Sequence, residues 1–363
     1  MISSAVEDYL RLSFTAGVGV VTARQLIEVC GSARAVWQQS KQDWLAVDGV
    51  GPKLVNALGK ANSEQVYTQI QTIVQQCEQE NIHLLCPEDD AWSCQLERCA
   101  DAPILLYAKG ELSCLNASHT LGMVGARKAS AEGKLITRRW ASYVSKQGVV
   151  VVSGMAPGID SAAHGGSLDA ESAGIAVLGY GLMAGSPLQN KQIEALAEKG
   201  CVVSEYAPDQ VAHPSFFPQR NRLIAGLSQA LLVVEGGLKS GSLITARQAL
   251  AYGREVFAVP GSVLNDVHAG CHHLIKDGAI LATDAQDILQ NMGWLDAGVA
   301  GEKYQPASVT EAKIIALLQV EIKHVDALAE DCGLTVPVLS TILLALELGG
   351  IIEKLPGSRY TLV

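Results

Sequence analysis

FFPQRNRLIAGLSQALLVVEGGLKSGSLITARQAL, residues 216–250, sets the architecture of this chain. We expect it to contain an Arg-Asn-Arg turn, a short helical segment, a buried strand (Ala230 to Val234) and a Gly-Gly-x-x-x-Ser-Gly-Ser loop that opens a second helix. Small residues at a strand-to-helix turn let backbone N–H groups approach an anion, and the N-terminus of a helix favours its charge. Lys239, Arg220 and Arg222 lie close by in sequence. The segment therefore predicts a phosphate-binding centre.

Strands and helices alternate on both sides of this segment, between Leu121 and Leu281. The first of these strands ends in Gly125-Ala126-Arg127-Lys128. Apolar strands that alternate with helices are typical of a parallel, doubly wound sheet whose ligands lie at the carboxyl ends of the strands. We therefore predict an α/β fold with an extended Rossmann-like core over residues 82–290. The expected strands are 83–86, 104–108, 121–124, 149–153, 175–178, 201–204 and 255–259, and the expected helices are 131–146, 159–168 and 191–199.

Smaller modules are expected on either side of the core. Residues 1–80 contain two similar patterns, AGVGVVTARQLIEVCG from Ala16 and VDGVGPKLVNALG from Val47, each a Gly-Val-Gly turn before an apolar helix. They predict a helical domain of the SAM or helix-hairpin-helix type, for which we favour packing over DNA contact. After a linker over 291–308, residues 309–363 follow the order of a winged helix-turn-helix. Its second helix is almost wholly apolar, which favours protein contact or packing over the reading of bases.

Charge and composition limit the classes of function. The net charge is −10, but residues 118–290 carry 14 basic and 14 acidic side chains, so only the core does not repel a polyanion. The nine cysteines are scattered without Cys-x-x-Cys, which fits reduced thiols. We see no secretory leader and no apolar run long enough to span a membrane. The expectation is a cytoplasmic protein that does not associate with membranes.

Other kinds of site are less well supported. The core has neither G-x-G-x-x-G at its first unit nor G-x-x-x-x-G-K-[ST], so no nucleotide cofactor is indicated. Asp160 and His164 lie four apart on one expected helix face, and we interpret them as structural. The segment 268–273 holds three histidines and one cysteine without a second distant pair, and we interpret it as a loop and not a metal site.

Seven motifs in order make the chain similar to a known family. They are VGAR (124–127), SGMAPGIDSAAH (153–164), AVLGYGL (176–182), FPQRNRLIAGLS (217–228), EGGLKSGSLITAR (235–247), GREVFAVPGS (253–262) and GCHHLIKDGA (270–279). With the helical N-terminal segment and the winged helix, the chain resembles the DNA-processing protein A family of bacteria (DprA, also called Smf) over essentially its whole length.

The resemblance implies a non-enzymatic protein without a cofactor. It implies binding of single-stranded DNA, a homodimer, and loading of the RecA recombinase onto that strand in natural transformation. The family's core arginine falls on Arg127. The candidate DNA-binding residues are Gly125, Arg127, Lys128, Phe217, Arg220, Arg222, Lys239, Ser240, Gly241 and Ser242.

This sequence departs from many relatives at two positions. Pro157 stands where many carry a basic residue, and Leu188 stands where some carry a lysine, with Lys191 nearby. Binding is therefore expected to depend more on Arg127 and Lys239. Phe216 and Phe217 are candidates for stacking on bases, and we expect one of the two to be buried.

Two other functions are compatible with parts of the sequence. Phosphoribohydrolases that act on nucleoside monophosphates have a similar Gly-Gly loop followed by a catalytic glutamate. Here Thr245 and Arg247 lie where the acid is needed, which argues against hydrolysis. A winged-helix transcription regulator with a ligand-sensing core is the third interpretation, and the apolar second helix opposes it.

Overall fold

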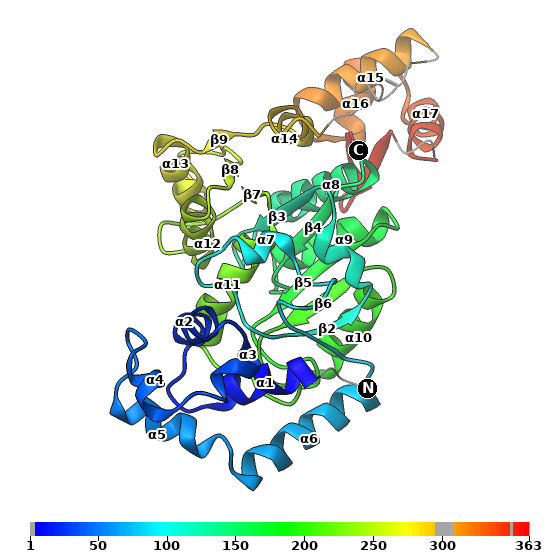
Figure 1. Ribbon diagram of the computed structural model, residues 1–363. Helices are drawn as coiled ribbons and strands as arrows, with labels where there is room; N and C mark the ends of the chain where they lie inside the picture. Colours follow the sequence, from blue (N-terminus) through cyan, green and yellow to red (C-terminus); the bar gives the residue numbers. More distant parts are fainter. Residues whose placement is uncertain (1–3, 295–305, 307, 349–350, 363) are drawn as a thin grey trace. The chain divides into compact units, whose positions relative to one another are not determined.

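The computed structural model describes residues 4–294, 306, 308–348 and 351–362. It divides into two compact units, Met1–Trp294 and Leu295–Val363, which we describe separately. The larger unit contains a nine-stranded sheet of order β1-β2-β6-β5-β4-β3-β7-β8-β9 (Figure 1). The strands are β1 (His83–Leu85), β2 (Leu106–Gly110), β3 (Thr120–Val124), β4 (Val150–Ser153), β5 (Gly174–Leu178), β6 (Cys201–Ser204), β7 (Ala230–Val233), β8 (Glu255–Ala258) and β9 (Ile280–Leu281).

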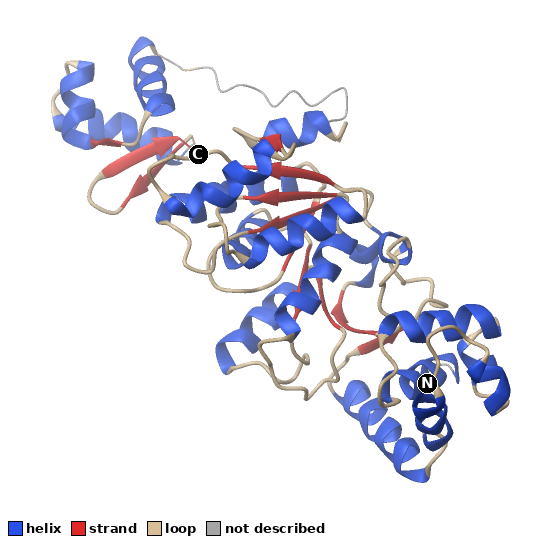
Figure 2. Ribbon diagram, turned by 90° about the vertical axis from the view of Figure 1, so that its left-hand side faces the viewer, coloured by secondary structure: helices blue, strands red, loops and turns tan. Residues whose placement is uncertain are grey.

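Strands β3 to β9 are parallel, and β2 and β1 extend the sheet in antiparallel fashion from β6. The α/β prediction is thus confirmed. The helices and 3-10 turns of the core are α7 (Cys94–Glu97), η1 (Leu112–Asn116), α8 (Ala131–Lys146), α9 (Ile159–Asp169), α10 (Pro187–Ala197), α11 (Phe216–Leu227), α12 (Gly241–Ala251), η2 (Asp266–His268), α13 (Ala269–Lys276) and α14 (Ala285–Asn291). Helices enclose the sheet, as Figure 2 shows.

The direction in which the chain builds the sheet reverses at β3. From β3 the chain adds β4, β5 and β6 on one side, and it then returns to add β7, β8 and β9 on the other. Because parallel crossovers are right-handed, the reversal places α8 and α9 on one face and α12 and α13 on the other. On the latter face, Leu223, Leu243 and Leu274 pack in one core with Leu231 and Val256. The carboxyl ends of β3 and β7 therefore flank the crevice in which doubly wound folds bind ligands.

The N-terminal helices repeat one local structure. They are α1 (Ser4–Phe14), α2 (Val20–Cys30), α3 (Ala33–Val36), α4 (Lys41–Leu45), α5 (Pro52–Lys60) and α6 (Glu64–Gln79). Both Gly-Val-Gly turns combine a left-handed glycine, Gly17 (φ 84°) or Gly49 (φ 76°), with an extended N-cap glycine, Gly19 or Gly51. Each turn thus reverses the chain between two helices, as the sequence predicts.

The N-terminal helices share a hydrophobic core with the sheet. Leu10, Leu26 and Leu58 belong to the same buried cluster as Tyr107 of β2 and Val202 of β6. The helical segment therefore belongs to the same compact unit as the sheet, and its separation as a domain over 1–80 stays a prediction.

The second unit contains the winged-helix elements. They are α15 (Val309–Val320), β10 (Lys323–His324), α16 (Val325–Cys332), α17 (Val336–Leu348), β11 (Ile352–Leu355) and β12 (Arg359–Leu362), with sheet order β10-β12-β11. In the described residues no single helix is long and apolar enough to cross a membrane; α16 with Val336–Glu347, bent by 107°, passes that test as a pair by length and composition alone. Leu328, Leu339 and Leu343 of this pair are buried in the core of the unit.

The structure bears on two further expectations from the sequence. Most of the predicted linker, 291–308, lies outside the described residues, but Trp294 is buried and stacks on His119 with ring centroids 5.3 Å apart. The segment 268–273 is not a loop, because α13 begins at Ala269. Cys271 is buried there, and its thiol donates to the carbonyls of Val233 and Val234. This cysteine therefore packs α13 against the end of β7.

Candidate nucleic-acid interface

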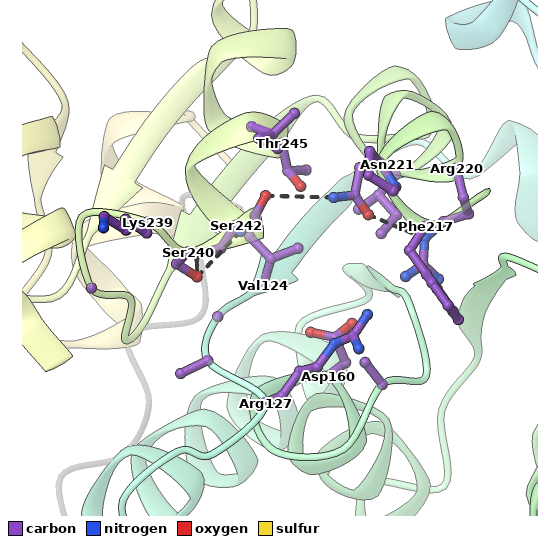
Figure 3. A pocket seen from close by; sticks show the side chains of 18 of the residues that line it. Val124, Arg127, Asp160, Phe217, Arg220, Asn221, Lys239, Ser240, Ser242 and Thr245 are labelled. Atoms are coloured by element: carbon purple, nitrogen blue, oxygen red, sulfur yellow. Dashed lines mark hydrogen bonds between the residues drawn. The ribbon is translucent and has the colours of Figure 1, made fainter. Parts of the chain in front are cut away.

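A cavity of about 610 Å³ lies at the point where the sheet reverses direction (Figure 3). It is bounded by the loops that follow β3, β4 and β7, by α11, and by the first turns of α12. We call it the switch-point cavity. Its lining residues are Val124, Gly125, Ala126, Arg127, Ala156, Asp160, Pro214, Phe217, Pro218, Arg220, Asn221, Ile224, Gly237, Lys239, Ser240, Gly241, Ser242, Ile244 and Thr245.

Two glycines let the three loops meet. A Cβ atom at Gly125 would lie 2.5 Å from Cγ1 of Ile159 and 2.8 Å from the carbonyl oxygen of Glu235, closer than real Cβ contacts allow. Gly158 has a φ of 93°, a conformation that favours glycine, and a Cβ atom there would lie 2.3 Å from the carbonyl oxygen of Ala126 and 2.6 Å from that of Arg127. These close approaches fix the loop that carries Arg127 against the start of α9.

The N-terminus of α12 forms one wall of the cavity. Ser240 is the N-cap, and its hydroxyl lies 2.8 Å from that of Ser242. On the α11 side, Nδ2 of Asn221 donates to the carbonyl of Gly241 at 3.5 Å. In the described part of the chain the N–H of Gly241 has no acceptor, as expected of the first residue of a helix. The wall thus offers a backbone donor, two hydroxyls and the positive end of a helix dipole.

The exposed cations of the cavity come from different loops. Arg127 follows β3, and its guanidinium carbon lies 4.9 Å from the ring centroid of Phe217. Lys239 follows β7 and lies on the opposite side of the cavity from Phe217 in Figure 3. Lys128 is exposed next to Arg127 but does not line the cavity. Within the described ranges no carboxylate pairs with Arg127, Lys128 or Lys239. Among the described residues neither Arg127 nor Lys239 is thus held in an ion pair, although the charge of Arg127 also acts on the pKa of the buried carboxyl of Asp160.

Arg220 lines the cavity, yet it is only 3% exposed. Its Nη1 donates to the carbonyl of Gly154 at 2.6 Å and to the carbonyl of Val177. The guanidinium therefore ties α11 to the ends of β4 and β5. These bonds give Arg220 a structural role in the cavity wall, and its contact with DNA stays a prediction.

Arg222 does not belong to the cavity. The segment expected as an Arg-Asn-Arg turn lies inside α11, and residues two apart on an α-helix point to nearly opposite sides. Arg222 donates to both carboxylate oxygens of Glu205 at 2.5 Å and to the carbonyl of Asp101 at 2.6 Å. Its placement at the anion site is wrong for this reason.

Asp160 is the one carboxylate among the lining residues of the cavity. It is 6% exposed, and one of its oxygens accepts from the N–H of Gly154 at 3.2 Å. Burial raises the pKa of Asp160 to about 6, although the charge of Arg220 opposes the shift. Burial likewise lowers the pKa of His164, one turn along α9, to about 4. The two side chains lie inside the protein at the start of α9, as their structural interpretation requires.

Glu235 follows strand β7, but it is not among the residues that line the cavity. It is 1% exposed, and it accepts a hydrogen bond from the N–H of Ser130 at 2.9 Å, beside the N-terminus of α8. Nothing in the sequence indicates this pairing, because the two residues are 105 positions apart. It removes a carboxylate from the surroundings of Lys239 and leaves the cavity more favourable to anions.

The two phenylalanines of α11 are both half-buried, so the expectation that one is fully buried is wrong. Phe217 lines the cavity beneath Arg127, whereas Phe216 stacks on Tyr206 with ring centroids 4.3 Å apart. Asn221 was not among the expected site residues, although it lies within the Arg-Asn-Arg segment. Pro157 and Leu188, the two departures from the family pattern, are exposed and do not line the cavity.

The chain matches two models of protein families. The model for DNA recombination-mediator protein A matches residues 83–293, and the model for the DprA winged helix domain matches residues 300–358.

Relatives extend over most of the chain. Protein Smf of Escherichia coli is 40% identical over 295 residues, which are 78% of this chain and 79% of that protein. The structure of DNA processing protein A from Streptococcus pneumoniae matches with a TM-score of 0.68 at 32% identity, over 80% of this chain and 98% of that one. A structure of DNA processing protein A from Helicobacter pylori, described for its single-stranded DNA binding mode, matches with a TM-score of 0.52 at 28% identity, over 58% and 95% of the two chains. This chain therefore belongs to the DNA recombination-mediator protein A family, whose members are also named DprA and Smf.

Proposed function

We propose that this chain binds single-stranded DNA through the switch-point cavity. The observation that carries the proposal is the arrangement of Arg127, Phe217 and Lys239 around the N-terminus of α12. A backbone phosphate is expected near the N–H of Gly241 and the hydroxyl of Ser242, and the adjacent base on the exposed part of the Phe217 ring. Proteins that bind single strands without sequence preference combine cations with such aromatic surfaces. The relative from Helicobacter pylori, described for binding single-stranded DNA, supports this assignment.

A single cavity with two free cations gives modest affinity. Each phosphate neutralised by a cation adds a salt-dependent contribution, and two such contacts are few. Linking several sites on one strand raises the overall affinity without new contacts. We therefore propose that the protein acts as a homodimer, or as a row of dimers, along the strand.

As a recombination mediator, the protein is proposed to protect incoming strands and to load the RecA recombinase onto them during natural transformation. The membership of the family supports this role, and the cavity supplies its DNA-binding step. The test is the rate at which RecA hydrolyses ATP on DNA that is covered by single-strand-binding protein. The chain should shorten the lag, and Arg127→Ala should restore it. An unchanged lag with the unmodified chain would contradict the loading role.

Hydrolysis of nucleotides is not part of the proposal. Asp160 has a raised pKa, which would suit a general acid, but its carboxylate is buried and bonded to the backbone. Thr245, which lies where a phosphoribohydrolase needs its glutamate, is 1% exposed. Incubation with nucleoside monophosphates should therefore give no free base. Release at enzymatic rates, abolished by Asp160→Asn, would contradict the proposal.

The direct test compares three cations. Arg127→Ala and Lys239→Ala should each weaken binding of an oligothymidylate and reduce the slope of log affinity against log salt by roughly 0.7. Lys146→Ala removes the same charge from the exposed far end of α8 and should change neither quantity. Fluorescence anisotropy at several salt concentrations gives both. Equal effects of all three variants would show general charge attraction and would refute a specific site.

A further inference from the structure

A second cavity, of about 600 Å³, lies on the other side of α11. Residues of α1, of α2 and of the turn between them line it on one side, and residues of β2, α11 and the segment after β6 line it on the other. We call it the hairpin cavity. Arg222 lines it, as do Val18 and Gly19 of the first Gly-Val-Gly turn. Two sequence features that the switch-point cavity does not explain therefore meet here.

The hairpin cavity carries no net charge. Glu205 and Arg222 are the charged side chains among its lining residues, and they neutralise each other in a bidentate pair. A buried pair of this kind has no charge left for a phosphate. The cavity therefore suits a neutral group.

Its walls contain aromatic rings and polar groups. Phe14, Tyr107 and Tyr206 contribute rings, and Gln210 and Gln219 contribute exposed amides. Tyr107 is 2% exposed, and within the described residues its hydroxyl has no hydrogen-bond partner. The hydroxyl oxygen itself is not fully buried, and Tyr107 lines the cavity, so the hydroxyl can donate a hydrogen bond to a group bound there.

The N-terminus of α2 adds a second donor. Gly19 is the N-cap of this eleven-residue helix and provides no side-chain cap, and Val20 is its first residue. Both line the cavity. The first N–H groups of a helix have no intrahelical acceptor, so they can donate to a carbonyl oxygen. Rings, amides, a free hydroxyl and free N–H groups together fit a flat heterocycle with hydrogen-bonding edges.

Aromatic side chains join the two cavities. Tyr206 of the hairpin cavity stacks on Phe216 with ring planes 23° apart, and Phe216 precedes Phe217 of the switch-point cavity. The hydroxyl of Tyr206 donates to the carbonyl of Phe216 at 3.3 Å, which holds the stack in place. The cavities lie on opposite sides of one helix, whose diameter with side chains is about 10–12 Å. A few nucleotides span that distance.

We propose that the hairpin cavity receives a nucleobase of the same DNA strand whose phosphate is held at the N-terminus of α12. The inference rests on the proposed function and adds to it a second contact, which involves the N-terminal hairpin. The helical segment thereby contributes to DNA binding through a base, and its acidic composition does not oppose that contact.

Two variants test the cavity without touching the switch-point site. Tyr107→Phe removes only the free hydroxyl and should weaken binding of an oligothymidylate of about twelve nucleotides two- to tenfold. Val18→Trp adds a bulky ring at a half-buried residue of the cavity lining and should weaken binding of the oligothymidylate about five- to 150-fold, the range for one stacked base. Tyr143→Phe, at an exposed tyrosine of α8, is the matched control and should have no effect. Melting temperatures of all three should match that of the unmodified chain.

Strand length separates this inference from the proposed function. A thymidine dinucleotide is too short to reach both cavities, so Tyr107→Phe and Val18→Trp should leave its affinity unchanged, whereas Lys239→Ala should weaken binding of both lengths. Loss of affinity for the long strand in the two cavity variants, with the short strand unaffected, supports the inference. Unchanged affinity for the long strand overturns it and leaves the proposed function intact. Insensitivity of both lengths to Lys239→Ala overturns the proposed function itself.

Photocrosslinking identifies the source of the base. A long strand with 5-iodouracil at one position after another should crosslink to Tyr107 or Tyr206 from a position a few nucleotides away from the one that crosslinks to Phe217. Crosslinks confined to Phe217 would overturn the inference. A second outcome would also overturn the inference: free thymidine binds saturably, Val18→Trp abolishes that binding, and the same variant leaves the affinity for the long strand unchanged. The cavity would then bind a free nucleoside and not a base of the strand.

Discussion

Because Arg220 is buried and Arg127 is exposed, the same substitution should mainly lower stability at Arg220 and mainly lower DNA affinity at Arg127. Arg220→Met removes two charge-assisted hydrogen bonds to the buried carbonyls of Gly154 and Val177. Each such bond contributes about 1.5–3 kcal/mol, and breaking a buried charged contact costs about 3–5 kcal/mol. For a unit of this size, about 2 °C accompanies each kcal/mol, so the melting temperature should fall by about 6–10 °C.

Arg127→Met changes an exposed side chain. Its loss removes a contact with the Phe217 ring that is worth about 0.5–1 kcal/mol, so the melting temperature should fall by about 2 °C at most. The DNA affinity should nevertheless drop, and the salt slope should decrease by roughly 0.7. Differential scanning calorimetry and anisotropy on both variants measure the two effects. Equal melting temperatures, or unchanged DNA affinity in Arg127→Met, would refute the division of roles between the two arginines.

Three further outcomes follow from the geometry. Gly125→Ala should destabilise the core and weaken DNA binding, because the added methyl meets the backbone of Glu235; a chemical denaturation curve equal to that of the unmodified chain would contradict the packing. Phe217→Leu should weaken binding of a single strand with normal bases by about 1–3 kcal/mol. It should not weaken binding of an abasic strand, which has no base to stack on the ring. As the pH rises from 4 to 7, the free energy of unfolding of Asp160→Asn should increase relative to that of the unmodified chain by up to about 3 kcal/mol. Urea unfolding at several pH values measures this difference.

The sign of the pH effect follows from the pKa of Asp160. Burial raises this pKa to about 6, above the unfolded value near 4, so the folded state binds a proton more tightly than the unfolded state does. The stabilisation present below pH 4 is lost as the pH rises to about 6. His164 titrates in the opposite direction, because burial lowers its pKa to about 4. The comparison with Asp160→Asn isolates the contribution of the aspartate. A difference in the free energy of unfolding that does not depend on pH would contradict the conclusion that burial disfavours the charged carboxylate.

The sequence predicts the core because apolar strand patterns alternate there with segments of helical periodicity. The strand Cys201–Ser204 and the helix Ala131–Lys146 have the expected bounds, and β7 ends one residue earlier than expected. The sequence also allows the proximity of the loops that contain Arg127 and Lys239 to be predicted, since these loops follow strands that are parallel neighbours in the sheet.

Side-chain direction within the site is harder to predict. The segment with Arg220 and Arg222 lacks a clear helical period, and the choice of turn over helix decides whether the two arginines share a face. The pairing of Glu235 with Ser130 depends on tertiary packing across 105 residues, for which local sequence has no signal. Sequence therefore identifies the loops of the site, whereas the structure is needed to separate the exposed cations from those that hold the fold.

The most direct test of the central claim is a structure of the chain with a bound oligothymidylate. A phosphate oxygen should lie about 2.7–3.2 Å from the N–H of Gly241 or the hydroxyl of Ser242, between Lys239 and Arg127, with a base on Phe217. A strand bound elsewhere, with the switch-point cavity free of nucleotide, would contradict the assignment of DNA binding to this site.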